Sequence, residues 1–505
     1  MRKTLACLFI FTLCIISTYS FAEADVLEKS PVEQVQPDHD THANYDGEEN
    51  LETLAEEGAH DAGHAPPAWT VIPFVALLLM IATGPLFYEH FWHKNYPKVA
   101  VIFAVVVVAY YLLVLHNTHS PVHALFEYIQ FISLLAALYI ASGGIMIDID
   151  KKATPMANVL LLLTGAVISN LIGTTGASML LIRPFMRLNK TRIQAYHVIF
   201  FIFVVSNIGG SLTPIGDPPL FLGFLKGVPF FWTLNHNSAA WAVAILLLLI
   251  VFYFFDKRNK INYLGDEEVE YTNKVQLIGA RNFFWLALVI AAVFLDPNVL
   301  PWVPAITFEG QKFSFLREII MLTVAFLSFK LANKKAIEGN DFSFEPIREV
   351  AFIFVGIFGT MMPALELVGA FAASPEGAKM ISHNTLYWGT GILSGFLDNA
   401  PTYINFLTAA LAAQGGSIGQ LNDVVAFAEG GVFHDSVLDL KAISIAAVFF
   451  GAFTYIGNGP NFMVKSIAEQ IGLKMPSFFG YIIRFSIPFL LPLLLVIWLI
   501  FFAFI

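Results

Sequence analysis

Cysteine and charge are both scarce in this chain of 505 residues. The only two cysteines, Cys7 and Cys14, lie inside the apolar N-terminal stretch from Leu5 to Ile16. If that stretch is removed, no cysteine remains, which excludes disulfides, thiol catalysis and cysteine-ligated metals. Charged residues make up 13% of the chain, whereas soluble domains carry about 25%. With 57% hydrophobic residues, the composition excludes an ordinary soluble enzyme and predicts an all-α membrane protein.

The sequence also lacks the patterns that carry enzyme chemistry. A phosphate-binding glycine loop, metal-ligand spacing and a nucleophile with a nearby base are all missing. We therefore expect a protein that is not an enzyme, needs no cofactor and binds no nucleic acid. Its expected partners are membrane lipids and small ions.

The N-terminus has the three parts of a secretory signal peptide, predicted at 1–22. Cleavage is expected after Ala22 or Ala24. Residues 23–68 carry thirteen acidic side chains against one basic, Lys29, and this composition predicts a disordered periplasmic tail. Four histidines in the tail could bind a metal or attract cations, although a solvated tail is the simpler interpretation; they are His39, His42, His60 and His64.

Apolar runs near the ~20 residues that a spanning helix needs recur along the rest of the chain. They predict about 10–11 spans, divided into a first transport repeat at 69–265, a cytoplasmic linker at 266–281 and a second transport repeat at 282–505. Basic loops should face the cytoplasm by the positive-inside rule. We expect a multi-pass protein of the bacterial inner membrane, with the N-terminal tail and the C-terminus in the periplasm.

Two apolar stretches, 155–186 and 385–413, are predicted to be re-entrant hairpins. The first is too long for one span, yet basic loops bound it on both sides, so it should enter from the cytoplasm and turn back. Its centre at 169–176 is polar and glycine-bearing, and such a segment cannot face lipid. The second has a polar centre at 394–402 and few basic residues beside it, so it should enter from the periplasm.

Each hairpin is followed by an apolar element that glycine and proline interrupt. The element at 194–232 is broken within 206–219, and the element at 440–470 is broken within 451–461. Unwound helices of this kind offer free carbonyl and amide groups to a ligand. The same order of parts in both halves, with one hairpin entering from each side, predicts two inverted-topology repeats and a binding site near mid-membrane.

Asp217 and Asp398 lie in these predicted breaks, and a carboxylate there costs roughly 2.5 to 3.5 kcal/mol unless it is compensated. We interpret both as carriers of a proton or an ion, with helix capping as the alternative for each. Neutral oxygens suited to Na+ surround them in the sequence; the predicted ion-binding residues are Ser169, Asn170, Thr174, Asn207, Thr213, Ser394, Asn399, Thr402, Asn458 and Asn461, and Thr454 has the same character.

Three other carboxylates are weaker candidates. Glu366 falls inside a predicted outward span and is a possible proton relay, or else a lumen-facing or interfacial residue. Asp148 and Asp150 are expected to end a helix at the cytoplasmic interface, although they could guard a proton path.

The first break, Ser206-Asn-Ile-Gly-Gly-Ser-Leu-Thr-Pro-Ile-Gly-Asp-Pro-Pro219, and the second hairpin, Leu397-Asp-Asn-Ala-Pro-Thr402, together resemble the ion transporter superfamily. The likeness is greatest to NhaD-type sodium/proton antiporters, which have a citrate transporter-like domain, and covers about residues 70–505. The resemblance implies that Asn207, Asp217, Ser394, Asp398 and Asn399 are functional and that the protein is a homodimer.

The tip of the first hairpin departs from this pattern. NhaD-type tips resemble Asp-Asn followed by threonines, whereas this chain has Ser169-Asn170, which is similar to dicarboxylate and citrate carriers. The segment 216–219 also resembles arsenite permeases and citrate transporters. The preferred hypothesis is exchange of Na+ or Li+ for H+. The alternatives are a Na+-coupled carrier for citrate or dicarboxylates and an arsenite-type efflux permease, although no basic residue lies in the predicted breaks to pair with an organic anion.

Overall fold

The computed structural model describes residues 66–504 except 262, 264–271, 273, 296, 298–299, 301 and 309–310. The chain divides at Trp69 into two units, and the fold belongs to the second, Thr70–Ile505. The predicted signal peptide, most of the acidic tail and much of the predicted linker lie outside the described residues, so these expectations stay predictions.

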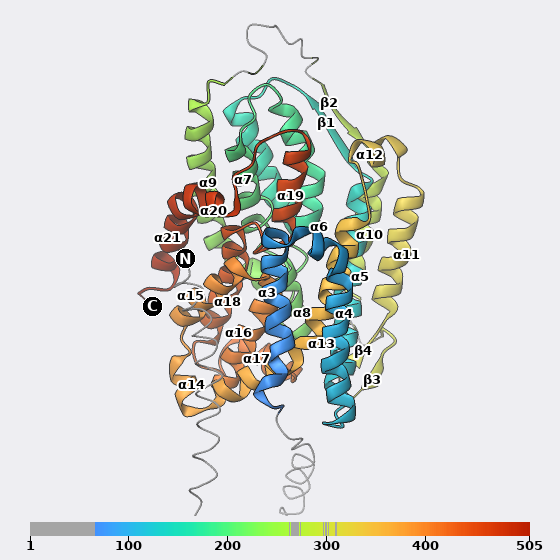
Figure 1. The fold of residues 1–505 in the computed structure, drawn as a ribbon, viewed down its shortest axis with the longest axis vertical. Helices are drawn as coiled ribbons and strands as arrows, with labels where there is room; N and C mark the ends of the chain where they lie inside the picture. Colours follow the sequence, from blue (N-terminus) through green and yellow to red (C-terminus); the bar gives the residue numbers. More distant parts are fainter. Residues whose placement is uncertain are drawn as a thin grey trace, which may run out of the picture. The chain divides into compact units, whose positions relative to one another are not determined.

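Helices make up most of the described fold, which confirms the predicted all-α membrane class (Figure 1). Within the described part, eight helices are long and apolar enough to cross a membrane. This is fewer than predicted, because several expected spans are folded back, broken or shorter than 18 residues. The long helices include α3 (Ile72–Phe87), α4 (Glu89–Leu113), α5 (His119–Gly143), α6 (Pro155–Leu188), α9 (Trp232–Arg258) and α13 (Glu345–Ala373).

Shorter elements complete the fold. They are η1 (Ala68–Val71), α7 (Ala195–Val204), η2 (Ile208–Gly210), α8 (Pro218–Lys226), α10 (Arg281–Val293), α11 (Leu316–Lys330), α12 (Lys334–Gly339), α14 (Pro375–Met380), α15 (His383–Phe396), α16 (Asn399–Ala413), α17 (Leu421–Glu429), α18 (Ser436–Phe450), η3 (Gly451–Phe453), α19 (Gly459–Gln470), α20 (Phe478–Tyr481), the π-helical η4 (Ile482–Leu490) and α21 (Leu491–Phe501).

Helix α6 folds back on itself at Gly173. This residue leaves the helical conformation with φ 78° and ψ 154°, in a region that glycine enters without a steric cost. The two arms then lie side by side, because Asn158 near one end and Asn189 just past the other exchange two side-chain hydrogen bonds of 2.8 Å each. A polar turn therefore lies where the sequence predicts the tip of the first hairpin.

Helices α15 and α16 form the second hairpin. Leu397 and Asp398 between them are extended, and a Cβ atom on Gly389 of α15 would lie 2.9 Å from the Phe406 ring of α16. The open end of this hairpin leads to α14 and α17, whereas α6 opens toward the end of the molecule that carries α7, α12 and α19 (Figure 1). The two hairpins thus point into the protein from opposite ends.

Two helices are interrupted where the sequence predicts breaks. The chain leaves α7, passes through η2 and a series of turns, and resumes as α8; α18 is followed likewise by η3 and α19. In each break the main chain passes close to itself at a glycine. A Cβ atom on Gly216 would lie 2.0 Å from the Gly210 carbonyl oxygen. A Cβ atom on Gly457 would lie 2.6 Å from the Gly451 carbonyl oxygen.

The prediction that Asp148 and Asp150 end a helix is wrong. Helix α5 ends at Gly143, and both carboxylates lie in strand β1 (Met146–Asp150), which pairs antiparallel with β2 (Lys274–Ile278). The alternation Met-Ile-Asp-Ile-Asp has the period of a strand. Its partner lies over a hundred residues away, so the sequence alone could not show the pairing. A second ribbon joins β3 (Ile306–Phe308) and β4 (Gln311–Phe313).

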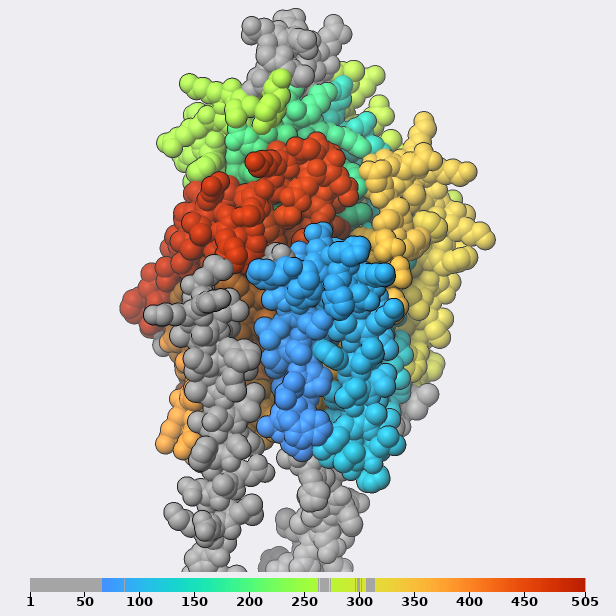
Figure 2. Space-filling model, viewed as in Figure 1, coloured from blue at the N-terminus to red at the C-terminus, as the bar shows by residue number. Residues whose placement is uncertain are grey.

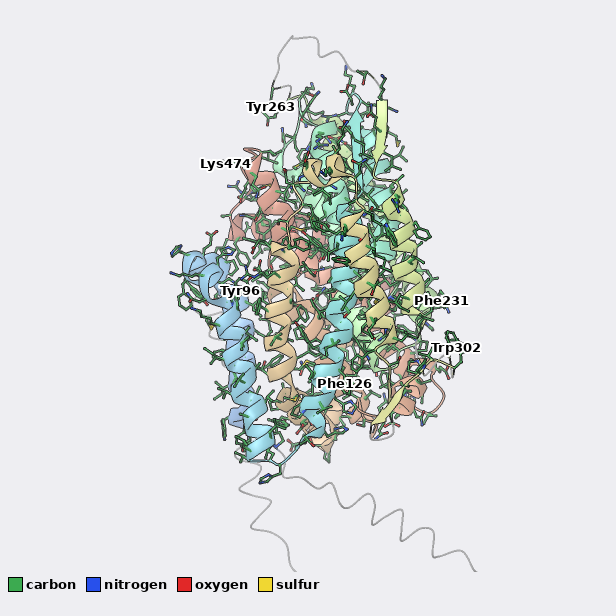
Figure 3. All side chains as sticks on the ribbon, turned by 90° about the vertical axis from the view of Figure 1, so that its right-hand side faces the viewer. Tyr96, Phe126, Phe231, Tyr263, Trp302 and Lys474 are labelled. Atoms are coloured by element: carbon green, nitrogen blue, oxygen red, sulfur yellow. The ribbon has the colours of Figure 1, made fainter. Side chains whose placement is uncertain are left out.

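Most of the core forms one large cluster that is rich in aromatic rings. Phe131 of α5 is fully buried and packs against Phe354 of α13 and Phe221 of α8, with ring centroids 4.4 Å and 6.2 Å away. Helices α3 and α4 pack on each other and form part of one face of the molecule (Figure 2). Tyr96 of α4 lies at the edge of the molecule opposite Phe231, which directly precedes α9 (Figure 3).

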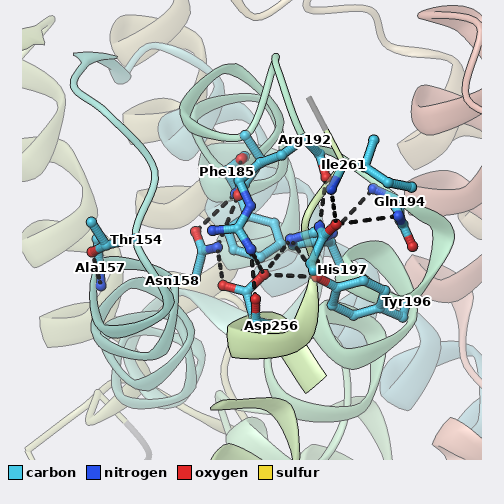
Figure 4. A network of polar contacts seen from close by, with 12 residues as sticks. Thr154, Ala157, Asn158, Phe185, Arg192, Gln194, Tyr196, His197, Asp256 and Ile261 are labelled. Atoms are coloured by element: carbon cyan, nitrogen blue, oxygen red, sulfur yellow. Dashed lines mark hydrogen bonds and ion pairs between the residues drawn. The ribbon is translucent and has the colours of Figure 1, made fainter. Parts of the chain in front are cut away.

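A buried polar network ties the base of the first hairpin to α7 and α9 (Figure 4). Asp256 is inaccessible to solvent, and its Oδ1 accepts hydrogen bonds from Arg192 and Tyr196, each at 2.7 Å. His197 Nδ1 accepts from the Gln194 amide, so its Nε2 carries the proton and donates to Asp256 Oδ1 at 3.0 Å. Asn158 donates to Asp256 Oδ2 at 2.9 Å. The network fixes the first arm of α6 relative to α7, and so relative to the first break.

Candidate functional site

The side chain of Asp217 lies where both hairpins and both breaks meet. Its Oδ1 accepts a hydrogen bond from Thr174 Oγ1 at 2.7 Å, just past the tip of the first hairpin, and one from Asn458 Nδ2 at 2.9 Å in the second break. Its Oδ2 accepts from Asn399 Nδ2 at 2.7 Å, at the tip of the second hairpin. Asp217 is 1% exposed. Four segments that are far apart in sequence therefore converge on one buried carboxylate.

The capping alternative is wrong for Asp217. The residue does precede the first turn of α8, but its side chain accepts no capping hydrogen bond there. The first two positions of α8 are Pro218 and Pro219, which have no amide hydrogen to donate. The carboxylate is free to face the other three segments instead.

Oxygen atoms are concentrated around the Asn458 amide nitrogen. Asp217 Oδ1 lies 2.9 Å from this nitrogen, and Asn207 Oδ1 and the Ser206 main-chain oxygen each lie 3.2 Å from it. An amide NH2 group has two hydrogens, so it cannot satisfy three acceptors at once. Three oxygens, one of them from a carboxylate, thus face one amide nitrogen, and they could ligate a hard cation if the Asn458 side chain moved aside.

The Asn207 and Asn461 side chains connect the two breaks. Asn207 Nδ2 donates to Asn461 Oδ1 at 2.7 Å and to the Ile202 carbonyl at 2.9 Å. Asn461 Nδ2 donates to the carbonyls of Gly451 and Thr454, at 2.8 Å and 2.9 Å. Asn461 therefore braces the second break, and the Asn207 oxygen is left facing Asn458.

The predicted residues of the first hairpin mainly hold the first break in place. Asn170 Nδ2 donates to the Gly209 carbonyl at 2.6 Å, and Asn170 Oδ1 accepts from the Leu212 amide at 2.8 Å. Thr213 Oγ1 donates to the Asn170 carbonyl at 2.6 Å, and Ser169 Oγ donates to the Val205 carbonyl at 2.8 Å. These oxygens are already engaged, so their ligand role stays a prediction.

The second hairpin is braced in a similar way. Ser394 Oγ donates to the Ala447 carbonyl at 2.6 Å, and Thr454 Oγ1 donates to the Gly395 carbonyl at 2.7 Å. Asp398 caps α16 by accepting from the Ala400 amide at 3.0 Å, and Thr402 Oγ1 donates to the Asp398 carbonyl at 2.9 Å. The geometry agrees with the capping alternative for Asp398, and a carrier role for it stays a prediction.

Glu366 lies apart from this centre. Its side chain is exposed on α13, where Oε1 accepts from Ser120 Oγ at 3.3 Å in the first turn of α5. None of the hydrogen bonds found in the described part of the chain joins Glu366 to Asp217 or its partners, and the relay stays a prediction.

The sequence did not indicate two features of the site. The Ser206 main-chain oxygen contributes to it, but a sequence reveals which side chains are present and not where a carbonyl points. Asp256 was not among the predicted site residues, whereas it is the centre of the buried network behind the site. Its place beside Lys257 and Arg258 gave no signal of burial, since its partners come from three other segments.

A helical membrane protein in which folded-back and interrupted helices meet at a buried carboxylate has the construction of a membrane carrier. A family model described as "Putative citrate transport" matches residues 63–502. The chain therefore belongs to this family, which indicates a membrane carrier. None of the curated proteins matches the chain.

Proposed function

We propose that the protein is a secondary active transporter that exchanges Na+ (or Li+) for H+ across the bacterial inner membrane. The observation that carries this proposal is the cluster of three oxygens around Asn458 Nδ2, which includes the carboxylate of Asp217. Hard cations favour oxygen ligands, and one carboxylate supplies the charge that a monovalent cation needs.

The partners of Asp217 explain how one group could bind either ion. With no cation present, the amides of Asn399 and Asn458 and the hydroxyl of Thr174 stabilise the ionised carboxylate by hydrogen bonds. A cation among the oxygens replaces the contact from Asn458. A proton on Asp217 removes the negative charge that holds the cation, so proton and cation compete for one site.

The two hairpins account for access from two sides. Thr174 comes from the hairpin that opens toward α7 and α19, and Asn399 from the hairpin that opens toward α14 and α17 (Figure 1). We propose that the two halves are inverted-topology repeats and that Asp217 and Asp398 both take part in ion transfer. Movement of the hairpin-bearing parts then exposes the site to one side at a time.

Proton flux in liposomes tests the exchange. Purified protein is reconstituted with an interior pH indicator, and Na+, Li+ or K+ is added outside. We expect Na+ and Li+ to drive proton movement and K+ to have no effect. The partly exposed Asp148→Asn variant should keep this activity, since Asp148 lies in the β1 strand and pairs with Arg187, and no hydrogen bond found in the described residues joins it to Asp217. Proton movement that does not depend on Na+ or Li+ would exclude exchange.

A Na+-coupled carrier for citrate or a dicarboxylate is the second candidate, and the family match favours it. An organic anion needs cationic or donor groups, whereas the side chains found around Asp217 are amides and a hydroxyl. Uptake of radiolabelled citrate or succinate into the same liposomes separates the two candidates. Uptake that requires Na+, together with absent proton flux, would establish the anion carrier.

A further inference from the structure

An apolar groove of about 350 Å³ lies beside the first break. It is lined by Val167 and Leu171 from the first arm of α6, Trp241 of α9 and Ile290 of α10. Phe231 and Phe294 also line it, with ring centroids 6.2 Å apart and planes inclined by 24°. Phe231 lies at the outer edge of the protein (Figure 3).

The groove offers almost no polar contacts to a ligand. Asn170 and Thr213 line it, but their polar atoms are engaged: Asn170 Oδ1 accepts from the Leu212 amide, and Thr213 Oγ1 donates to the Asn170 carbonyl. A ligand that needs hydrogen bonds or a charge partner therefore gains little here. The groove suits a flexible, purely apolar chain.

The surroundings of the groove identify its occupant. Val167 and Leu171 on α6 are 49% and 51% exposed, and Phe231 directly before α9 is 55% exposed. Both helices are long and apolar enough to cross a membrane, so the groove opens toward lipid. It also lies where two groups of helices meet, because α10 packs on α5 and α11 whereas α9 packs on α6 and α18. We propose that this groove binds an acyl chain of a membrane phospholipid between these two groups of helices.

The bound acyl chain would influence the ion site through Trp241. The indole Nε1 donates to the Gly209 carbonyl at 3.1 Å, and the same carbonyl accepts from Asn170 Nδ2 at 2.6 Å. Gly209 belongs to η2 in the first break, between Asn207 and Asp217. An acyl chain packed on the Trp241 ring stabilises this bond and, with it, the conformation of the break.

Fluorescence quenching by brominated lipid tests the proposal. The full chain is reconstituted in phosphatidylcholine with or without bromine on its acyl chains, and the emission of Trp241 is obtained by subtracting the emission of Trp241→Phe. We expect Trp241 to be quenched. The corresponding difference for Trp92→Phe should show little quenching, because Trp92 is only 1% exposed.

Variants that fill the groove distinguish quenching by an acyl chain bound in it from quenching by the surrounding lipid. Val167→Phe places a ring in the groove and should abolish the quenching of Trp241, while Val101→Phe on the exposed face of α4 should not. If Val167→Phe lowers the folded yield, Ile290→Phe fills the groove from α10. Unquenched Trp241 in the unmodified chain, as expected if a second copy covers the groove, would overturn the proposal. Quenching that persists equally in both filled variants would also overturn it.

Discussion

Asp217 and Asn458 occupy matching positions in the two breaks and hydrogen-bond to each other at 2.9 Å. Asp217 stands in Ile215-Gly-Asp-Pro-Pro219, and Asn458 stands in Ile456-Gly-Asn-Gly-Pro460. Each directly precedes the helix that resumes after the break. One half of the chain thus contributes a carboxylate and the other an amide at the same point.

Gly216, where the first break passes close to its own main chain, should contribute to stability. In Gly216→Ala, the added methyl group would meet the Gly210 carbonyl oxygen, and relief of that overlap requires main-chain movement. Overpacking of this kind typically costs about 1–3 kcal/mol. Thermal unfolding in detergent should show a lower midpoint, with lower transport in liposomes.

Gly459→Ala is the matched control for this substitution. Gly459 begins α19 after the second break, has no neighbour within 4 Å of an added Cβ atom and does not have a positive φ. Its unfolding midpoint should stay close to that of the unmodified protein. If the unfolding midpoint falls equally in the two variants, the close approach at Gly216 is not the cause of the destabilisation.

The network around Asp256 should contribute strongly to stability. Asp256→Asn removes the buried anion that Arg192 and His197 share, and the loss of one partner of a buried ion pair costs about 3–5 kcal/mol. Asp341→Asn breaks the ion pair with Arg183, in which the Asp341 side chain is 80% exposed, and exposed pairs contribute only about 0–1 kcal/mol. Thermal unfolding should separate the two variants clearly, and similar midpoints would contradict this role for Asp256.

Pairing of β1 with β2 should weaken in acid. The Thr272 amide and hydroxyl donate to Asp150, which lowers the pKa of this carboxyl below its ordinary value. A group with a lowered pKa in the folded state stabilises the structure above its ordinary pKa of about 3.9, and this contribution is lost as the pH falls through the lowered value. Hydrogen exchange of the 274–278 amides should therefore accelerate in acid relative to Asp150→Asn measured at the same pH. A constant ratio between the two proteins at all pH values would rule out the effect.

Much of the fold could be predicted because the hairpin turn and the helix breaks contain residues that are typical of them. Gly173, Gly216 and Gly457 mark a turn and two close approaches, and the prolines near Gly216 and Gly457 exclude continuous helix there. The β1–β2 pairing and the burial of Asp256 could not be predicted, because both depend on segments that are distant in sequence.

The candidate site was predictable only in part. Asp217, Asn399, Asn458 and Thr174 could be identified from polarity within apolar elements, and they do meet. Ser169, Asn170, Ser394 and Asn461 have the same polarity, yet their side chains hold main-chain carbonyls of the hairpins and breaks. Residue type does not distinguish a side chain that binds an ion from one that holds the main chain in place, because both roles use the same oxygen and amide groups.

Proton release on Na+ addition tests the central claim most directly. Purified protein in a weakly buffered solution is titrated with NaCl or, as a control, with choline chloride, while the pH is recorded. If Na+ and H+ compete for Asp217, Na+ should release protons from the unmodified protein, choline should not, and Asp217→Asn should release none. Proton release from Asp217→Asn equal to that of the unmodified protein would contradict the assignment of Asp217 as the ion-exchanging group.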